Sequence, residues 1–532
     1  MKASAPTIDS RWPLILGVAI ATAMIAQQLA GKAIRDAFFL SHFGASALPT
    51  AMMVASTLSI ISVLGTARIY RVVAPARLVP WVFFGSAAWF LAEWALSLHF
   101  PRIAAASLYI HTTSFGAVVV SGFWSVVNER FDPHTAKRVI AQIAGGATIG
   151  GMLGGLAAWQ GSNHLSVTAM ILALGAVNLL CGILMYLFGR GVHDAVAAST
   201  ASKPAPSVLA IMEETPYLWQ LAFLVATSAL AAAAFDYVFK ARAAAAFANS
   251  EDLVSFFSLF YLGLGIGTFI FQQLFAGPSL RWLGLTATVA TMPVAVIAFG
   301  LFALVVGGLT SVVMLRAAAA ITESSLYRSG YELLYTPLAP EKKRPTKTMI
   351  DVGGDKLGAA IGGGLSLVVV QTVPGAAEPI LLSLAVGCGC LALITASLLQ
   401  SGYVRALADS LRTGRVSSSE LNLDDRVSRK TAEETKILSR DSLGPQFMAP
   451  TTAVRTTRAE APQPTTLPPQ VLSTLDVPIA DNSDILKALA ALRSQDTERI
   501  RKVLQWYPRL PADIVPAVVM IVKNDELRPE LM

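Results

Sequence analysis

Ionisable side chains interrupt several long apolar stretches of this 532-residue sequence. A charge in a hydrocarbon layer is costly, so such residues are expected to face one another or a wet cavity and to carry function. Basic groups there could bind a multiply charged anion through charge-assisted hydrogen bonds, and acidic groups could couple or gate its movement. The candidate binding residues are Arg35, Asp236, Lys240, Arg316, Lys347 and Lys356. The candidates for coupling or gating are Asp36, Glu93, Glu323, Asp351 and Asp355.

Helical spacing places some of these residues on shared faces. Arg316 and Glu323 are seven residues apart, so two turns bring them to one side of a helix. Asp351 and Asp355 are four apart and share a face likewise. Any one of them could equally form an internal ion pair or extend toward the membrane surface. The grouping of charges on four predicted helices favours one shared cavity, whereas His111 is interpreted as a buried helix residue rather than a proton relay.

The sequence contains no motif for enzymatic chemistry. A phosphate-binding Gly-x-x-x-x-Gly-Lys-Ser/Thr loop and the His-Glu-x-x-His and Cys-x-x-Cys spacings are all missing. The glycine-rich run 262–267 lies inside an apolar stretch, where helix packing explains it better than dinucleotide binding. Three cysteines, all in apolar stretches, offer no disulfide framework. We therefore predict no enzyme, no cofactor and no metal site.

The elements that must position the charges are membrane helices. The sequence is 54% hydrophobic and 14% charged, with a mean hydropathy of +0.57, which excludes an ordinary soluble domain. A helix needs about 20 apolar residues to cross a bilayer. About twelve such stretches occur, near 12–31, 47–66, 78–98, 103–127, 139–159, 165–189, 217–238, 253–275, 283–303, 305–327, 350–372 and 378–400.

The distribution of lysine and arginine predicts the orientation. Loops after even-numbered stretches hold 14 of these residues and loops after odd-numbered ones hold 5. Positive loops stay in the cytoplasm, so both termini are predicted to be cytoplasmic. No cleavable signal peptide is recognisable, and the first stretch is predicted to be a membrane helix. The basic residues are not clustered, which argues against a nucleic-acid partner.

Two glycine-rich runs indicate an internal duplication. Residues 144–155 read Ala-Gly-Gly-Ala-Thr-Ile-Gly-Gly-Met-Leu-Gly-Gly, and 352–363, shifted by 208, read Val-Gly-Gly-Asp-Lys-Leu-Gly-Ala-Ala-Ile-Gly-Gly. Glycine at every fourth position leaves a bare helix face on which a neighbouring helix can approach closely. The Ala-Thr pair of the first copy is replaced by Asp355 and Lys356 in the second. The site is therefore expected near the second copy.

A weaker similarity relates 35–40 to 235–240, with a shift of 200. Two six-helix halves joined by a cytoplasmic linker are the plan of major-facilitator transporters, in which the substrate binds between the halves. The predicted fold is thus an all-α membrane protein with a flexible extension rich in Ser, Thr and Pro and a short helical C-terminal segment. The predicted divisions are 1–189 for the first half, 190–216 for the linker, 217–403 for the second half, 404–478 for the disordered linker and 479–532 for the helical segment.

Several segments resemble the ATP/ADP translocase family of intracellular bacteria and plastids. They are Arg-Asp-Ala-Phe-Phe-Leu-Ser-His-Phe-Gly at 35–44, Phe-Trp-Ser-Val-Val-Asn-Glu-Arg-Phe at 123–131, Ala-Lys-Arg-Val-Ile at 136–140, Phe-Asp-Tyr-Val-Phe-Lys at 235–240, Glu-Leu-Leu-Tyr-Thr-Pro at 332–337, and Lys347 followed by Ile-Asp-Val at 350–352. The resemblance covers roughly 12–400, and the C-terminal segment is similar to a bacterial branch with a helical-repeat extension.

The resemblance implies a major-facilitator-like fold and exchange of nucleotides. It implies that Arg35 is a basic residue in contact with phosphate, that Asp236 stands at an acidic position of the seventh helix, and that Lys347 is the lysine before the Ile-Asp-Val element. The family's nucleotide exchangers are expected to carry glutamate, not the shorter aspartate, at the position of Asp236.

Three functional hypotheses follow. The leading one is a secondary transporter that exchanges a nucleotide or another phosphorylated small molecule by alternating access. The second is proton-coupled transport of another solute, with Asp36, Glu93, His111 and Asp236 as titrating groups. The third is a membrane scaffold that does not transport and whose C-terminal helical segment holds a protein partner.

Overall fold

The protein is helical throughout the part of the chain that its structure, a computed structural model, describes. The described residues are 12–70, 73–131, 133–190, 208–338 and 340–412. All of them belong to one compact unit. The predicted all-α fold is confirmed for this part. Most of the predicted 190–216 linker and of the 404–478 linker, and the whole 479–532 segment, lie outside the described residues.

Six long helices make up the first half of the bundle. Proline occupies the first turn of five of them, where its missing N–H leaves no hydrogen bond unmade. A short 3-10 turn, η1 (Ala45–Ala47), joins the first two helices. The helices are α1 (Trp12–Phe43), α2 (Leu48–Ile69), α3 (Pro75–His99), α4 (Pro101–Arg130), α5 (Pro133–His164) and α6 (Val167–Gly189).

The second half repeats this arrangement with two interruptions. Its predicted tenth stretch begins at Gly308, because Gly307 and Gly308 adopt φ values of 68° and 80° and turn the chain there. Two π-helical segments, η2 (Glu323–Tyr327) and η3 (Met349–Gly354), break the regular helices. The α-helices are α8 (Val208–Glu214), α9 (Tyr217–Ala246), α10 (Ser250–Trp282), α11 (Gly284–Val306), α12 (Gly308–Thr322), α13 (Arg328–Leu333), α14 (Pro340–Thr348), α15 (Asp355–Thr372) and α16 (Ala377–Arg412); the 3-10 turn η4 is Pro374–Ala376.

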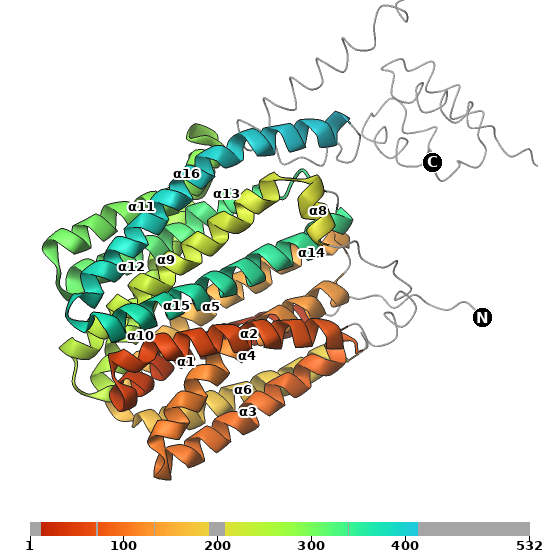
Figure 1. Ribbon diagram of the computed structural model, residues 1–532. Helices are drawn as coiled ribbons and strands as arrows, with labels where there is room; N and C mark the ends of the chain where they lie inside the picture. The colour runs from red at the N-terminus through yellow and green to blue at the C-terminus, as the bar shows by residue number, and fades with distance from the viewer. Residues whose placement is uncertain (1–11, 71–72, 132, 191–207, 339, 413–532) are drawn as a thin grey trace, which may run out of the picture. The chain divides into compact units, whose positions relative to one another are not determined.

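Ten helical segments of the described chain are long and apolar enough to span a membrane. The two glycine-rich helices, α5 and α15, are not among the ten. Glycines and polar residues lower the mean hydropathy of these helices, yet both pack against neighbouring helices of the bundle. In Figure 1, α15 lies between α9 and α2, and the contacts agree.

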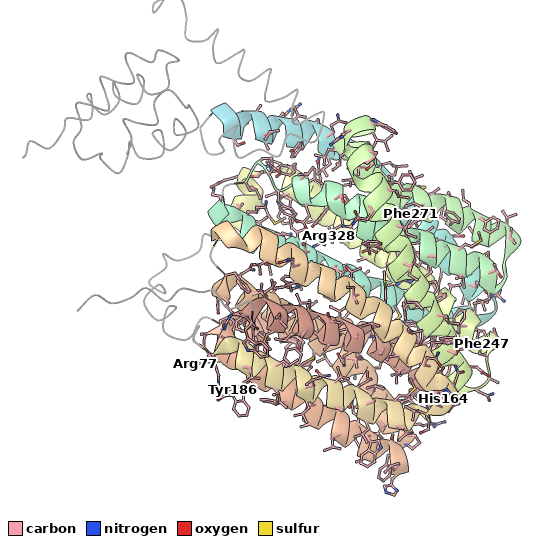
Figure 2. The ribbon with its side chains drawn as sticks, turned by 180° about the vertical axis from the view of Figure 1, so that it is seen from behind. Arg77, His164, Tyr186, Phe247, Phe271 and Arg328 are labelled. Atoms are coloured by element: carbon pink, nitrogen blue, oxygen red, sulfur yellow. The ribbon has the colours of Figure 1, made fainter. Side chains whose placement is uncertain are left out.

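The bundle has two distinct ends. We call the end at which α1 begins the near end and the opposite end the far end. Figure 2 shows Arg77 and Tyr186 at the near end and His164 and Phe247 at the far end. A hydrophobic core shared by both halves includes Phe39, Leu108 and Phe235, and it extends through the second half to Tyr217 and Leu407. At the near end, the first half has a separate core of its own, which includes Ile20 and Phe123.

Candidate functional site

The buried carboxylate of Asp36 is the centre of a charge cluster between the halves. Arg35 donates to its Oδ1 with an Nη2–Oδ1 distance of 2.7 Å, and Lys240 of α9 places Nζ 3.2 Å from Oδ2. The Tyr261 hydroxyl of α10 also donates to Oδ2, at 3.1 Å. Asp36 is fully buried. Residues of both halves thus share this one carboxylate.

A second carboxylate, Asp236, extends the cluster into the second half. Its Oδ2 lies 2.8 Å from Nζ of Lys240, one turn further along α9. Its Oδ1 accepts from Nε of Arg316 on α12, at 3.0 Å. On the other side, Arg35 donates to Thr113 of α4 at 2.9 Å. A continuous polar chain therefore crosses the bundle from α4 to α12.

Cations outnumber carboxylates in this cluster. Lys32, on the same face of α1 as Asp36, holds its Nζ 4.6 Å from the ring centre of Tyr261. With Arg35, Lys240 and Arg316, it makes four basic side chains around two aspartates. Buried cations in excess of their carboxylate partners attract an anion strongly, because the surroundings screen them little. The arrangement can bind phosphate-like groups, which would compete with the aspartates for the same donors.

Solvent reaches part of the cluster. The side chains of Asp36 and Lys240 are 0% and 2% exposed, whereas those of Asp236 and Arg316 are 15% and 14% exposed. Both of the latter residues belong to the second half. Lys32 of the first half is partly exposed as well. Solvent, and hence a ligand, therefore reaches the cluster at Arg316, Asp236 and Lys32.

Glycine contacts define how the two halves correspond. A Cβ atom at Gly150 would lie 2.2 Å from the Thr22 carbonyl oxygen, and one at Gly358 would lie 2.2 Å from that of Ala226. A Cβ atom at Gly154 would lie 2.2 Å from the Ala26 carbonyl oxygen, and one at Gly362 would lie 2.9 Å from that of Leu230. Gly358 and Gly362 follow Gly150 and Gly154 by 208 residues, while Ala226 and Leu230 follow Thr22 and Ala26 by 204. The packing thus relates α1 to α9 with a shift of 204, one helical turn away from the shift of 200 that the sequence similarity predicts.

This correspondence inverts the charges of the two helices. With a shift of 204, Lys32 corresponds to Asp236 and Asp36 corresponds to Lys240. Each helix therefore carries one lysine and one aspartate, four residues apart, in opposite order. The inversion brings Asp36 and Lys240 together across the interface, where two identical copies would place like charges against each other.

The glycines after these contacts join the two halves. A Cβ atom at Gly155 of α5 would lie 3.0 Å from Cβ of Leu262 on α10, and one at Gly363 of α15 would lie 3.0 Å from the backbone nitrogen of Met53 on α2. In Figure 2, α5 runs beside α10. The glycine runs therefore serve helix packing in both copies, in accordance with their spacing.

A polar cavity of about 260 Å³ lies inside the second half, toward the near end. It is bounded by α9, α11, α15 and the two π-helical segments. Segments of π-helix are frequent at functional sites. Glu323, Asp351 and Asp355 line it. The hydroxyl groups of Tyr331 and Tyr335 donate to Oδ1 of Asp351. Burial and this carboxylate raise the pKa of Tyr335, so its hydroxyl keeps the proton that it donates.

Two predicted binding lysines lie apart from the charge cluster. Lys347 places Nζ 2.5 Å from Oε2 of Glu332, which also pairs with Arg328 at 3.1 Å. Lys356 pairs with its neighbour Asp355 at 2.9 Å. Of the predicted residues, the structure brings together Arg35, Asp36, Asp236, Lys240 and Arg316; it places Lys347 and Lys356 nearer to the polar cavity.

Glu93 and His111 form a separate buried pair in the first half. Oε2 of Glu93 lies 3.2 Å from Nδ1 of His111, and Nε2 of that histidine lies 3.0 Å from the Ser86 hydroxyl. The Ser107 hydroxyl donates to Oε1 of Glu93 at 2.8 Å. Every polar atom of the pair thus has a partner, as expected for groups this deeply buried.

The sequence reasoning missed Lys32 and the aromatic residues of the cluster. Lys32 is counted as a loop residue and is therefore not considered for the site. Its spacing of four from Asp36 places both residues on one helix face and could have identified it. The ring of Tyr109 lies 4.8 Å below the Arg35 guanidinium carbon, and Tyr261 holds Asp36. No local signal distinguishes these tyrosines from others in apolar helices.

Comparison with known proteins identifies the family. The sequence profile of the TLC ATP/ADP transporter family matches residues 104–400, more than half of the chain. The chain belongs to the TLC ATP/ADP transporter family. It is therefore a multi-pass membrane transporter with a small-molecule substrate. No curated protein matches the chain in a sequence search.

Several solved structures of transporters align with the chain. The nucleoside transporter NupG aligns with a TM-score of 0.53 and 15% identity, over 74% of this chain and 99% of that one. A single-residue mutant of NupG aligns with a TM-score of 0.52 and 14% identity, over 73% and 99%. A bacterial homologue of the human lysosomal transporter Spinster, inward-facing and occupied, aligns with a TM-score of 0.47 and 14% identity, over 78% and 100%. At such identities, the NupG alignment speaks for the fold alone, which agrees with the predicted major-facilitator-like arrangement.

Proposed function

We propose that this protein exchanges nucleotides across a bacterial inner membrane by alternating access, with both termini in the cytoplasm. The observation that carries the proposal is the charge cluster, in which Lys32, Arg35, Lys240 and Arg316 surround two carboxylates at the interface of the halves. Family membership supports nucleotides as the class of substrate. Gradients of the exchanged nucleotides alone drive the exchange.

The cluster suggests how binding and movement are linked. Without substrate, Lys240 bridges Asp36 of the first half and Asp236 of the second, which holds the halves together. A phosphate that enters from the Arg316 side competes with both aspartates for their donors. Arg35 and Lys240 then turn to the substrate, the ion pairs between the halves weaken, and the halves can rock about the glycine contacts.

Exchange is tested with purified protein in liposomes. Vesicles preloaded with unlabelled ATP should take up labelled ADP, and empty vesicles should not. Arg35→Gln should reduce the uptake at least about tenfold, because one charged hydrogen bond is worth about 1.5–3 kcal/mol. Arg102→Gln, an exposed arginine at the far end, serves as the matched control. Uptake that does not depend on preloading for any nucleotide would contradict the proposal.

A second candidate, proton-coupled transport of another solute, rests on the buried Glu93 and His111 pair. A histidine that is hydrogen-bonded to a carboxylate can serve as a proton shuttle. Acidification of the vesicle lumen during uptake, lost in His111→Gln, would favour this candidate over exchange.

A further inference from the structure

The polar cavity of the second half stands where the first half has a filled core. With the shifts that the glycine contacts define, Ser228 corresponds to Met24, and Asp351 corresponds to Ile143. Met24 and Ile143 are 1% and 0% exposed and belong to the hydrophobic core of the near end. The repeated scaffold can therefore be closed with apolar side chains at this place, and in the second half it is left open.

The cavity wall offers acceptors that have no protein donor. The carboxylate of the exposed residue Glu323 lines the cavity and makes no hydrogen bond or ion pair within the described residues. The Ser228 hydroxyl, on the α9 side, is buried and likewise has no partner among them. A buried hydroxyl without a partner, such as that of Ser228, is uncommon in proteins and points to a missing ligand or water.

The carboxylates are not arranged for a metal ion. Among the described residues, no group of three or more His, Cys, Asp or Glu side chains is placed to hold one. The wall instead has an aromatic part, where the rings of Tyr327 and Tyr331 lie nearly parallel, 5.5 Å apart and 16° from coplanar. A flat group with N–H donors at its edge would stack on this wall and donate to the carboxylates.

The cavity continues toward the charge cluster. Glu323 follows Arg316 by seven residues, which corresponds to about 10 Å along a helix. Ala232 of the cavity wall is one turn from Asp236. The cluster has an excess of cations, whereas three acidic residues and the single base Arg328 line the cavity. A ligand with an anionic end and a donor-bearing end thus has one favoured orientation.

The size of the cavity agrees with part of a ligand. At about 260 Å³, it lies below the range of about 300–1,000 Å³ that sites for whole drug-sized molecules occupy. We propose that this cavity holds the base of the transported nucleotide, with Glu323 and Ser228 as acceptors and Tyr327 as the stacking surface, while the phosphates bind at the charge cluster. The inference rests on the proposed function and assigns the two ends of the substrate.

Inorganic triphosphate separates the two ends, because it carries the phosphates without a base. In the liposome assay, unlabelled ATP and inorganic triphosphate compete with labelled ATP for uptake. In Glu323→Gln, we expect the half-inhibiting concentration of ATP to rise roughly tenfold, as for one hydrogen bond to a charged group, and that of triphosphate to stay the same. Arg316→Gln should raise both.

Two further variants keep the test decisive. Ser228→Ala removes one hydroxyl and should also raise the half-inhibiting concentration of ATP, by a smaller factor. This variant provides the test if Glu323→Gln does not fold. Glu332→Gln, an acid of α13 outside the cavity wall, is the matched control and should not change the ratio of the two half-inhibiting concentrations.

Each outcome bears on a separate claim. In both cavity variants, the half-inhibiting concentrations of ATP and triphosphate could rise equally, or neither could change. Either outcome would overturn the base site and would leave the proposal of nucleotide exchange intact. Failure of triphosphate to compete with the wild-type protein would overturn the assignment of the phosphates to the cluster. Absence of nucleotide uptake by the wild-type protein would overturn the proposed function and this inference together.

Discussion

The two halves share a scaffold and differ in what they place on it. In both, the glycine-rich helix approaches the first helix of its own half so closely that no side chain fits between the backbones. Behind this contact, the first half holds an apolar core and the second half a polar cavity. Backbone contacts are thus preserved where side-chain chemistry has diverged.

The difference indicates that packing and binding are under separate constraints. A glycine contact depends on backbone geometry and tolerates almost no change, because an added Cβ would overlap a carbonyl oxygen. Side chains at other positions of the same helix, such as Asp355 in place of Ala147, leave that contact intact. One copy can therefore acquire charge while both keep their shape. Four predictions test this division.

The largest effect is expected at the carboxylate that both halves share. Asp36→Asn leaves the buried Lys240 and Arg35 without one charged partner, and we expect the free energy of unfolding in detergent to fall by about 3–5 kcal/mol. Chemical unfolding followed by tryptophan fluorescence measures it. In the double variant Asp36→Asn/Lys240→Met, part of the loss should be recovered. Glu251→Gln, an exposed acid at the start of α10, is the control. Wild-type stability in Asp36→Asn would contradict the role of the cluster in joining the halves.

The next prediction exchanges corresponding side chains between core and cavity. Met24→Ser should lower the free energy of unfolding by about 2–4 kcal/mol, because it leaves a void in a filled core. Ser228→Met places the same side chain in an existing cavity and should leave stability within about 1 kcal/mol while nucleotide uptake is lost. Thermal unfolding and liposome uptake are measured on both variants. If Ser228→Met transports like the wild type, the cavity plays no part in transport.

The scaffold contacts should respond alike in both halves. Gly150→Ala and Gly358→Ala each force helix backbones apart, and we expect similar losses of about 1–3 kcal/mol. Gly145→Ala is the matched control, since no neighbouring atom lies within 4 Å of a Cβ there. A loss confined to one of the two glycines would show that the halves do not share one scaffold.

The smallest effect is expected at the near-end lysine. Lys347 is partly exposed and pairs with an exposed carboxylate of Glu332, so Lys347→Ala should change the free energy of unfolding by no more than about 1 kcal/mol. The same unfolding assay detects it, and high salt should reduce the difference further. A loss comparable to that of Asp36→Asn would place Lys347 in the structural network of the cluster.

The class and the repeated plan of this protein follow from the order of its amino acids. Apolar stretches separated by charged loops predict membrane helices because the bilayer demands internal hydrogen bonding, and the copied glycine run reveals the duplication. Charges in these stretches also predict Arg35, Asp36, Asp236, Lys240 and Arg316 as members of a shared polar site, since an isolated charge would be too costly there. These inferences depend on local composition and spacing alone.

Which charges meet is a matter of how the helices pack in three dimensions. A register error of one turn is invisible in a sequence of apolar residues, yet it decides whether Asp36 corresponds to an aspartate or to Lys240. The contribution of Tyr261, the separate pairing of Lys347 and the open cavity beside Glu323 all depend on helices far apart in the chain. Such contacts depend on how closely two helix backbones approach each other. That separation is determined by the side chains of both helices, so the sequence of one helix does not specify it.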